Sequence, residues 1–149
     1  MSRRQTGMTL IELMIVVVVL GIIVAIGVPS YRGYIIRANR VDGTSALLRL
    51  AANQERFYMQ NNTYASNAEL AAALPAGLGI PGTDHGYYNL TIAAAGAGLV
   101  VGYTATAAVI VGESQGADTD CWQFTVNELG LRTATMKAPP VDNTGVCWQ

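Results

Sequence analysis

The sequence predicts an α+β fold in which one long N-terminal helix packs on a four-stranded antiparallel β-sheet. Two observations support this prediction. An unbroken apolar run over Leu13–Val28 is followed by helical spacing from Tyr31 to Ala52, and side chains alternate with a period of two from Tyr87 onward. Between these segments glycine and proline recur often enough to break regular structure. One amphipathic helix laid on one antiparallel sheet buries the apolar faces of both and makes a two-layer domain.

The composition excludes several classes of protein. The chain has 149 residues, of which 51% are hydrophobic and only 13% are charged, and its formal net charge is −1. Low charge with high hydrophobicity excludes a disordered tail, and a near-zero net charge argues against a general nucleic-acid binder. A single His and two Cys that lie far apart argue against a structural zinc site.

Much of the hydrophobicity lies in one block near the N-terminus. As a helix, Met8–Val28 would be about 31 Å long, enough to cross the ~30 Å hydrocarbon core of a bilayer. The block contains a single charged residue, Glu12, and it follows Arg3 and Arg4. Because basic residues stay on the cytoplasmic side of a membrane, this order predicts a cytoplasmic N-terminus.

Three interpretations of the apolar block are open. It could be a secretory signal peptide with Ala25-Ile26-Gly27 as its cleavage site, or a plain membrane anchor. The third interpretation explains Glu12, because a carboxylate inside an apolar span is costly and indicates a function. If the chain were cut between Gly7 and Met8, the new α-amino group would lie one helical turn from Glu12. The two charges could then neutralise one another, within one chain or between neighbouring chains.

The segment Gly7-Met8-Thr9-Leu10-Ile11-Glu12-Leu13, after a short basic leader, resembles the type III signal of type IV prepilins. The family usually has Phe where this chain has Met8. The resemblance implies that a prepilin peptidase removes the leader by cleavage after Gly7 and methylates the new N-terminus at Met8. It also implies that Glu12 is an assembly residue, which neutralises an N-terminal amine.

The helix is expected to be weakest where it leaves the apolar block. Pro29 lacks a backbone donor, and Gly21 and Gly27 have low helix propensity. In filaments of the pilin family the corresponding stretch loses helical structure. The resemblance therefore implies a helix break over Gly21–Pro29, with a simple proline kink as the alternative.

Helical spacing resumes after Pro29. A stripe with 3,4 spacing is expected to pack on the C-terminal domain, while the other side of the helix faces neighbouring subunits. Five arginines against two acids give this half a net charge of +3, either as a solvated face or as a row that meets acidic neighbours. The stripe consists of Tyr31, Tyr34, Ala38, Val41, Ser45, Leu48 and Ala52, and the arginines are Arg32, Arg37, Arg40, Arg49 and Arg56.

Residues 65–86 are expected to connect the helix to the sheet, with one short helix at Ser66–Leu74. His85 lies in this connection without a second His or a nearby thiol, so it is expected to be an ordinary loop histidine. The expected strands are Tyr87–Ala95, Leu99–Ala107, Cys121–Val126 and Leu131–Met136.

Cys121 and Cys147 would lie on the oxidising side of the membrane, so they are expected to form a disulfide that ties the C-terminal tail to a strand. The pilin family commonly has such a pair. Asp118 and Asp120 make a pattern too short for an EF-hand, and no metal site is expected. The residues beyond Phe57 include seven acids and two bases, so no direct nucleic-acid site is evident in the head.

The sequence contains no visible nucleophile–base–acid set, metal cluster or phosphate-binding loop, so no catalytic residue, enzyme activity or cofactor is expected. The family resemblance extends over nearly the whole chain and is nearest to PilE-type minor pilins. It implies a structural subunit of a type IV pilus, a fimbrium that serves twitching motility, cell adhesion or DNA uptake. A major pilin and a type II secretion pseudopilin are the alternatives, followed by a secreted enzyme or an anchored adhesin. The matching segments also include Gln54–Tyr64, Gly86–Ile92 and Cys147-Trp148.

The resemblance also implies partners, locations and segment boundaries. The partners are other pilins in a homo- or hetero-oligomeric filament, the prepilin peptidase, and an assembly platform with its ATPase. The subunit would be a single-pass protein of the inner membrane before it joins the extracellular pilus. The expected segments are the leader 1–7, the membrane-spanning and assembly half of the helix 8–29, and the head 30–149.

Overall fold

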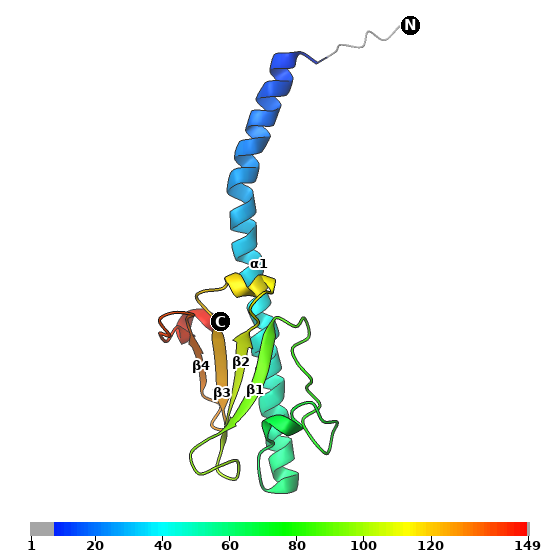
Figure 1. Ribbon diagram of the computed structural model, residues 1–149, viewed down its shortest axis with the longest axis vertical. Helices are drawn as coiled ribbons and strands as arrows, with labels where there is room; N and C mark the ends of the chain where they lie inside the picture. The colour runs from blue at the N-terminus through cyan, green and yellow to red at the C-terminus, as the bar shows by residue number, and fades with distance from the viewer. Residues whose placement is uncertain (1–7, 149) are drawn as a thin grey trace, which may run out of the picture. The chain divides into compact units, whose positions relative to one another are not determined.

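The computed structural model describes residues 8–148, and within them the α+β fold class is confirmed (Figure 1). The chain divides into two compact units, one that ends at Ile35 and one that begins at Ile36. The elements of the described chain, in order, are α1 (Leu10–Asn61), η1 (Asn67–Glu69), β1 (Tyr88–Ala94), β2 (Tyr103–Val109), η2 (Ser114–Ala117), β3 (Gln123–Asn127), β4 (Arg132–Thr135) and α2 (Thr144–Cys147).

The first unit contains helix α1 up to Ile35. It is helical from Leu10 without interruption, and Pro29 lies inside the helix. Valine and isoleucine dominate this stretch and are modest helix formers in water. A helix nevertheless suits an apolar span, because in lipid it satisfies the backbone groups internally.

The second unit is a two-layer domain in which the rest of α1 lies on one face of the sheet. The strands of the described chain pair antiparallel in the order β1–β2–β3–β4, as a simple meander (Figure 1). One row of paired residues crosses the whole sheet, and its four side chains are buried. The row consists of Leu90, Ala107, Phe124 and Ala134.

Helix α1 packs closely against β1 at Gly43, and its buried face contains both apolar and polar side chains. Leu47 and Leu50 are fully buried there. Gly43 faces β1, where an added Cβ would lie only 3.0 Å from the ring of Tyr88. Gln54 is fully buried and bridges α1 to the following connection, because its Nε2 donates to the carbonyl of Ala65 at 2.9 Å and its Oε1 accepts the same residue's N–H at 2.7 Å.

The predicted packing stripe of α1 is wrong. Val41 and Leu48, two members of that stripe, are 64% and 40% exposed. The buried stripe lies on the opposite side of the helix and has the same 4,3 spacing. Because it contains a glycine and a glutamine, it gives a weaker apolar signal in the sequence. Its members include Gly43, Leu47, Leu50, Gln54 and Phe57.

The predicted strand ends differ from the structure by one to four residues, and the largest differences are at the start of β2 and in the predicted short helix. The sequence predicts the second strand from Leu99, but β2 begins at Tyr103, and Leu99 lies in the β1–β2 loop. Gly96 and Gly98 in this loop have positive φ values of 47° and 113°, a conformation that glycine adopts readily. The short helix predicted at Ser66–Leu74 is only the single turn η1.

Candidate functional site

The first unit presents a continuous apolar surface. From Leu10 to Val28 every large apolar side chain is exposed, from 47% at Val16 to 78% at Leu10. The helix is long and apolar enough to cross a membrane. Such a surface requires a cover, because soluble proteins rarely expose large contiguous apolar patches.

Glu12 lies in the first turn of α1 and contacts Thr9. Its backbone N–H donates to Thr9 Oγ1 at 3.3 Å, and the N–H of Thr9 donates to Glu12 Oε2 at 3.5 Å. Met8 precedes the helix and is 67% exposed. Gly7 lies outside the described residues. Cleavage after Gly7, methylation of Met8 and neutralisation by Glu12 stay predictions.

The residues of the predicted helix break lie inside the continuous helix α1. An added Cβ at Gly21 or Gly27 would meet nothing within 4 Å, so packing within the described chain does not require glycine at either position. The helical geometry also continues through Pro29. The loss of helix implied by the resemblance concerns the filament, and it stays a prediction.

Helix α1 has a second exposed surface in the unit that begins at Ile36, on the side opposite to the sheet. We call it the outer helix face, and it contains Val41, Leu48 and Met59, which are 64%, 40% and 77% exposed. Arg37 and Arg56 on the same side are also exposed. Apolar residues mixed with arginine are typical of protein–protein interfaces.

Arg40 and Arg49 form ion pairs within the chain, so the predicted arginine row is not a uniform solvated face. Arg40 is nearly buried, and its Nε and Nη2 donate to the two carboxylate oxygens of Asp118 at 2.7 and 2.9 Å. Arg49 lies at the surface, and its Nη2 donates to Asp84 Oδ1 at 2.9 Å. Arg40 is therefore a structural contact, which leaves Arg37 and Arg56 as exposed cations of the outer helix face.

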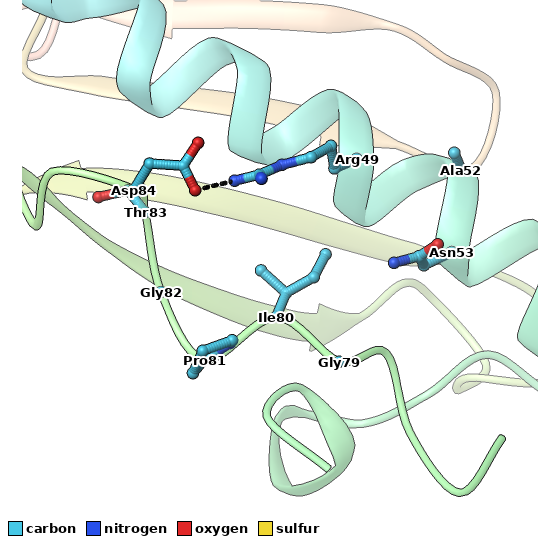
Figure 2. A pocket seen from close by; sticks show the side chains of 9 residues that line it. All are labelled: Arg49, Ala52, Asn53, Gly79, Ile80, Pro81, Gly82, Thr83 and Asp84. Atoms are coloured by element: carbon cyan, nitrogen blue, oxygen red, sulfur yellow. Dashed lines mark hydrogen bonds and ion pairs between the residues drawn. The ribbon is translucent and has the colours of Figure 1, made fainter. Parts of the chain in front are cut away.

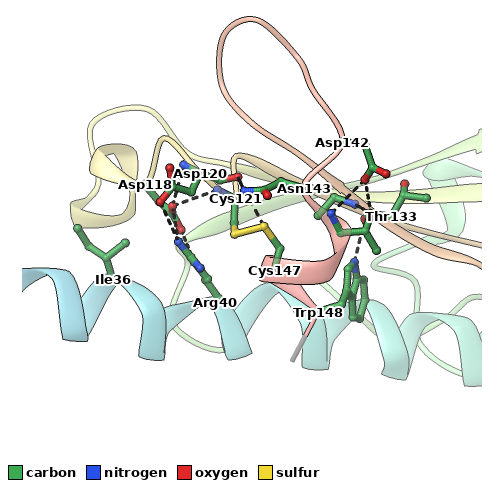
Figure 3. Close-up of a disulfide and its surroundings, with 12 residues drawn as sticks. Ile36, Arg40, Asp118, Asp120, Cys121, Thr133, Asp142, Asn143, Cys147 and Trp148 are labelled. Carbon is green, nitrogen blue, oxygen red and sulfur yellow. Dashed lines mark hydrogen bonds and ion pairs between the residues drawn. A yellow bond between two sulfur atoms is a disulfide. The ribbon is translucent and has the colours of Figure 1, made fainter.

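Asp118 is the centre of a buried polar cluster beside the disulfide (Figure 3). Besides Arg40, it accepts hydrogen bonds from Gln115 Nε2 at 3.0 Å and from the N–H of Cys121 at 3.1 Å. Gln115 also donates to the carbonyl of Ile36 at 3.1 Å. The cluster docks the β2–β3 connection on α1 and engages both oxygens of Asp118. Among residues 8–148, no group of three or more His, Cys, Asp or Glu side chains is placed to hold a metal ion.

Cys121 and Cys147 form the disulfide expected on the oxidising side of the membrane, with their Cα atoms 5.7 Å apart (Figure 3). The bond joins the residues before β3 to the short helix α2. Trp148 Nε1 donates to the carbonyl of Thr133 at 2.8 Å. These contacts fix the C-terminal segment against β3 and β4.

The connection from α1 to β1 forms an open recess of about 480 Å³ against the helix (Figure 2). Arg49 and Asp84 pair across it, and Asn53 Nδ2 donates to the carbonyl of Leu78 at 2.8 Å. These polar contacts hold the connection on α1. The recess is lined by Arg49, Ala52, Asn53, Gly79, Ile80, Pro81, Gly82, Thr83 and Asp84.

Asp42 holds the end of the same connection. Its buried carboxylate accepts the N–H of His85 at 3.1 Å and the N–H of Tyr87 at 3.3 Å, and His85 Nδ1 lies 3.2 Å from its Oδ1. Burial by itself raises the pKa of Asp42, but hydrogen bonds from Thr83, His85 and Tyr87 lower that pKa below its ordinary value. The sequence predicts His85 to be an ordinary loop histidine, and that prediction does not include its contact with Asp42.

Both basic residues of the segment after Phe57 lie over tryptophan rings. Arg132 Cζ lies 5.4 Å from the ring centroid of Trp148, and Lys137 Nζ lies 4.3 Å from that of Trp122. Sequence reasoning missed these pairs and the Arg40–Asp118 cluster because the partners are distant in the chain. For the Arg40–Asp118 cluster, the signal in the sequence was a charged residue, Arg40, within the helix that packs on the sheet.

Two protein-family models match this chain and together cover most of its length. A family model described as "Prokaryotic N-terminal methylation motif" matches residues 2–28. A second model, described as "Type IV minor pilin ComP, DNA uptake sequence receptor", matches residues 29–125, more than half of the chain. The chain belongs to the type IV pilins. The match to this pilin ends within β3, before β4 and Cys147.

Curated relatives of the pilin include a secretion protein and a fimbrial subunit. Type II secretion system core protein G of Dickeya chrysanthemi is 31% identical over 74 residues, which are 50% of this chain and 48% of the relative. Type IV major fimbrial protein FimA of Dichelobacter nodosus is 44% identical over 57 residues, which are 36% of this chain and 35% of the relative. The pilin therefore spans about half or less of the length of these relatives.

A solved structure of a type IV pilin from Shewanella oneidensis is also similar to this pilin. It shares 20% sequence identity, the alignment covers 65% of this chain and 89% of that chain, and the TM-score is 0.45. Type IV pilins are a structural family rather than a class of enzymes. The methylation motif implies processing by a prepilin peptidase and assembly with other pilins, and the apolar helix fits membrane anchoring before assembly into a pilus.

Proposed function

We propose that this pilin is a minor structural subunit of a type IV pilus. The prepilin peptidase removes residues 1–7 by cleavage between Gly7 and Met8 and methylates Met8. Residues 8–29 hold the subunit in the inner membrane with its N-terminus in the cytoplasm, and residues 30–149 form the head. An assembly platform and its ATPase then move the subunit into a helical filament.

This proposal rests on a difference in burial between the two parts of α1. The part in the second unit packs on the sheet, whereas the large apolar side chains from Leu10 to Val28 are exposed within the chain. Lipid covers them in the membrane, and the helices of neighbouring subunits cover them in the filament. Because lipid gives helices little hydrophobic reason to associate, polar contacts have to supply the register. Glu12 is the charged residue of the span that can do so.

The decisive experiment combines the mature N-terminus with an assembly assay. Mass spectrometry of subunits from purified pili is expected to find a chain that begins with methylated Met8. Glu12→Ala is expected to abolish incorporation into pili. A mature chain that begins at Val28, or normal incorporation of the Glu12→Ala variant, would contradict the proposal. Quantified subunit ratios in the same pili separate a minor pilin from a major one.

A second candidate function is DNA reception during uptake. The description of the family model that matches residues 29–125 favours it. The two cation–tryptophan pairs of the head, Arg132 with Trp148 and Lys137 with Trp122, offer positive charge beside aromatic rings, a combination that binds nucleic acids. The excess of acids in the same head opposes it.

Fluorescence anisotropy with labelled duplex DNA at low and at physiological salt tests this second candidate. Binding that weakens with salt and that the double variant Arg132→Ala/Lys137→Ala loses would support it. If the unmodified pilin fails to bind duplex DNA even at low salt, the candidate is excluded.

A further inference from the structure

We propose that Thr9 is a positioning residue for Glu12, and that the two side chains form a capping box that fixes the first turn of α1 in lipid. The inference rests on the proposed function, because it concerns the same carboxylate that is assigned to assembly. It adds a task that Glu12 performs within its own chain, before it meets a neighbouring subunit.

The position of the helix start supports this assignment. Thr9-Leu10-Ile11-Glu12 has the Ser/Thr-x-x-Glu pattern that precedes an apolar run in a capping box. Helix α1 begins at Leu10, directly after Thr9. The carbonyl of Thr9 accepts the N–H of Leu13 at 3.2 Å, the first backbone bond of the helix. Thr9 therefore occupies the N-cap position.

The side-chain contacts are reciprocal, as a capping box requires. Thr9 Oγ1 accepts the N–H of Glu12 at 3.3 Å, and Glu12 Oε2 accepts the N–H of Thr9 at 3.5 Å. Each side chain therefore satisfies a backbone donor of the other residue. The contact also turns the Glu12 carboxylate back toward the start of the helix, which is the direction that helical side chains favour.

The lipid surroundings make this contact more important than a cap on a soluble helix. The first N–H groups of any helix lack partners within the helix, and water normally satisfies them. Hydrocarbon offers no such partners, so side chains of the chain itself have to supply acceptors. The carboxylate also lies at the positive end of the helix dipole. Thr9 thereby keeps it beside Met8, whose α-amino group cleavage would release.

Capping and assembly need different chemistry of Glu12, and this difference makes the proposal testable. A capping box needs a hydrogen-bond acceptor, which glutamine also provides. Neutralisation of an amine needs a negative charge, which glutamine lacks. Likewise Thr9→Ser keeps the capping hydroxyl, whereas Thr9→Val removes it at nearly constant shape.

The test measures amide hydrogen exchange by NMR in the full-length processed pilin, in nanodiscs of phosphatidylethanolamine and phosphatidylglycerol. Thr9→Val is expected to speed exchange of the Glu12 amide about fivefold, the equivalent of about 1 kcal/mol for an N-cap. Thr9→Ser is expected to keep the protection of the unmodified chain. Glu12→Gln is expected to keep the Thr9 amide protected, whereas Glu12→Ala exposes it.

Incorporation into pili is measured for the same variants. Thr9→Val is expected to lower the amount of subunit in purified pili, and Thr9→Ser to restore it, while Glu12→Gln stays out of pili although its helix start is intact. Unchanged exchange in Thr9→Val, or equal exchange in Thr9→Val and Thr9→Ser, would overturn the proposal. So would faster exchange with unchanged incorporation, because Thr9 would then be a helix cap without a positioning role.

The two proposals can fail separately. If Thr9→Val behaves as expected but Glu12→Ala joins pili normally, the assembly role of Glu12 fails and the capping box stands. If Glu12→Ala stays out of pili while exchange in Thr9→Val is unchanged, the capping box fails and the assembly role stands.

Discussion

Arg40 differs from the other arginines of α1 in its surroundings. Its side chain is 11% exposed, and that of its partner Asp118 is 1% exposed. Burial disfavours the charged guanidinium, but the hydrogen bond and the charge of Asp118 raise the pKa of Arg40 above its ordinary value. Arg40 therefore stays charged, and its contact with Asp118 joins α1 to the β2–β3 connection. Removal of one partner would leave the other as an uncompensated buried charge.

Arg40→Ala is expected to lower the free energy of unfolding by about 3 kcal/mol, because it strands the Asp118 carboxylate. Urea unfolding of the detergent-solubilised chain, followed by tryptophan fluorescence, measures the change. Arg37→Ala is the matched control on the exposed side of the helix and should stay within about 0.5 kcal/mol of the unmodified chain. Equal effects of the two substitutions would show that the buried pair has no structural role.

The depressed pKa of Asp42 predicts a pH dependence of stability. A carboxylate whose folded pKa lies below its unfolded value of 3.8 stabilises the fold above that value, and this contribution disappears as the pH falls through the folded pKa. Asp42→Asn is therefore expected to destabilise the chain at neutral pH, and its difference from the unmodified chain to shrink below about pH 4. Urea unfolding at several pH values measures both. Asp84→Asn, in an exposed ion pair, serves as the control with a small effect. A difference that grows in acid would contradict the assignment.

Among the elements, the sheet could be predicted from sequence better than the helix face that covers it. Alternation in Thr104-Ala105-Thr106-Ala107 marks β2, because one face of the sheet is buried and the other is not. In α1 two stripes with the same spacing compete, one with Val41 and Leu48 and one with Leu47 and Leu50. The apolar pattern alone cannot choose between them, because both sides of the helix carry apolar residues at helical spacing. The polar contacts that mark the buried side involve residues far apart in the chain.

At the same scale, loss of the disulfide is expected to destabilise the second unit. The bond closes a loop between cysteines 26 residues apart, so the double variant Cys121→Ala/Cys147→Ala is expected to lose about 3.5 kcal/mol of unfolding free energy on the chain-entropy estimate. Urea unfolding with and without dithiothreitol measures the loss. The reduced unmodified chain should match the double variant, and a double variant as stable as the oxidised chain would refute the expectation.

For the whole molecule, the assignment to the type IV pilins explains why so much apolar surface is uncovered within one chain. The span from Leu10 to Val28 and the outer helix face are both parts of α1. The methylation motif and the N-terminal apolar block were readable from sequence, because contiguous residues form them. Assembly partners were not readable in the same way, since their contacts lie between chains.

Leu48→Asp tests whether the outer helix face contacts neighbouring subunits. Because Leu48 is 40% exposed, the substitution should change the free energy of unfolding little, by about 0.5 kcal/mol or less. In purified pili it should lower the amount of incorporated subunit about tenfold, as for 1.4 kcal/mol at an interface. Thr91→Asp, on the exposed face of β1, is the control and should assemble normally. Equal assembly of both variants would exclude the outer helix face from the contact.

The continuity of α1 has a mechanical consequence. The chain passes from the first unit into the second once, within helix α1, and strands β1–β4 all belong to the second unit. In the filament proposed above, a pulling force on the apolar span would therefore reach the second unit through the backbone of α1.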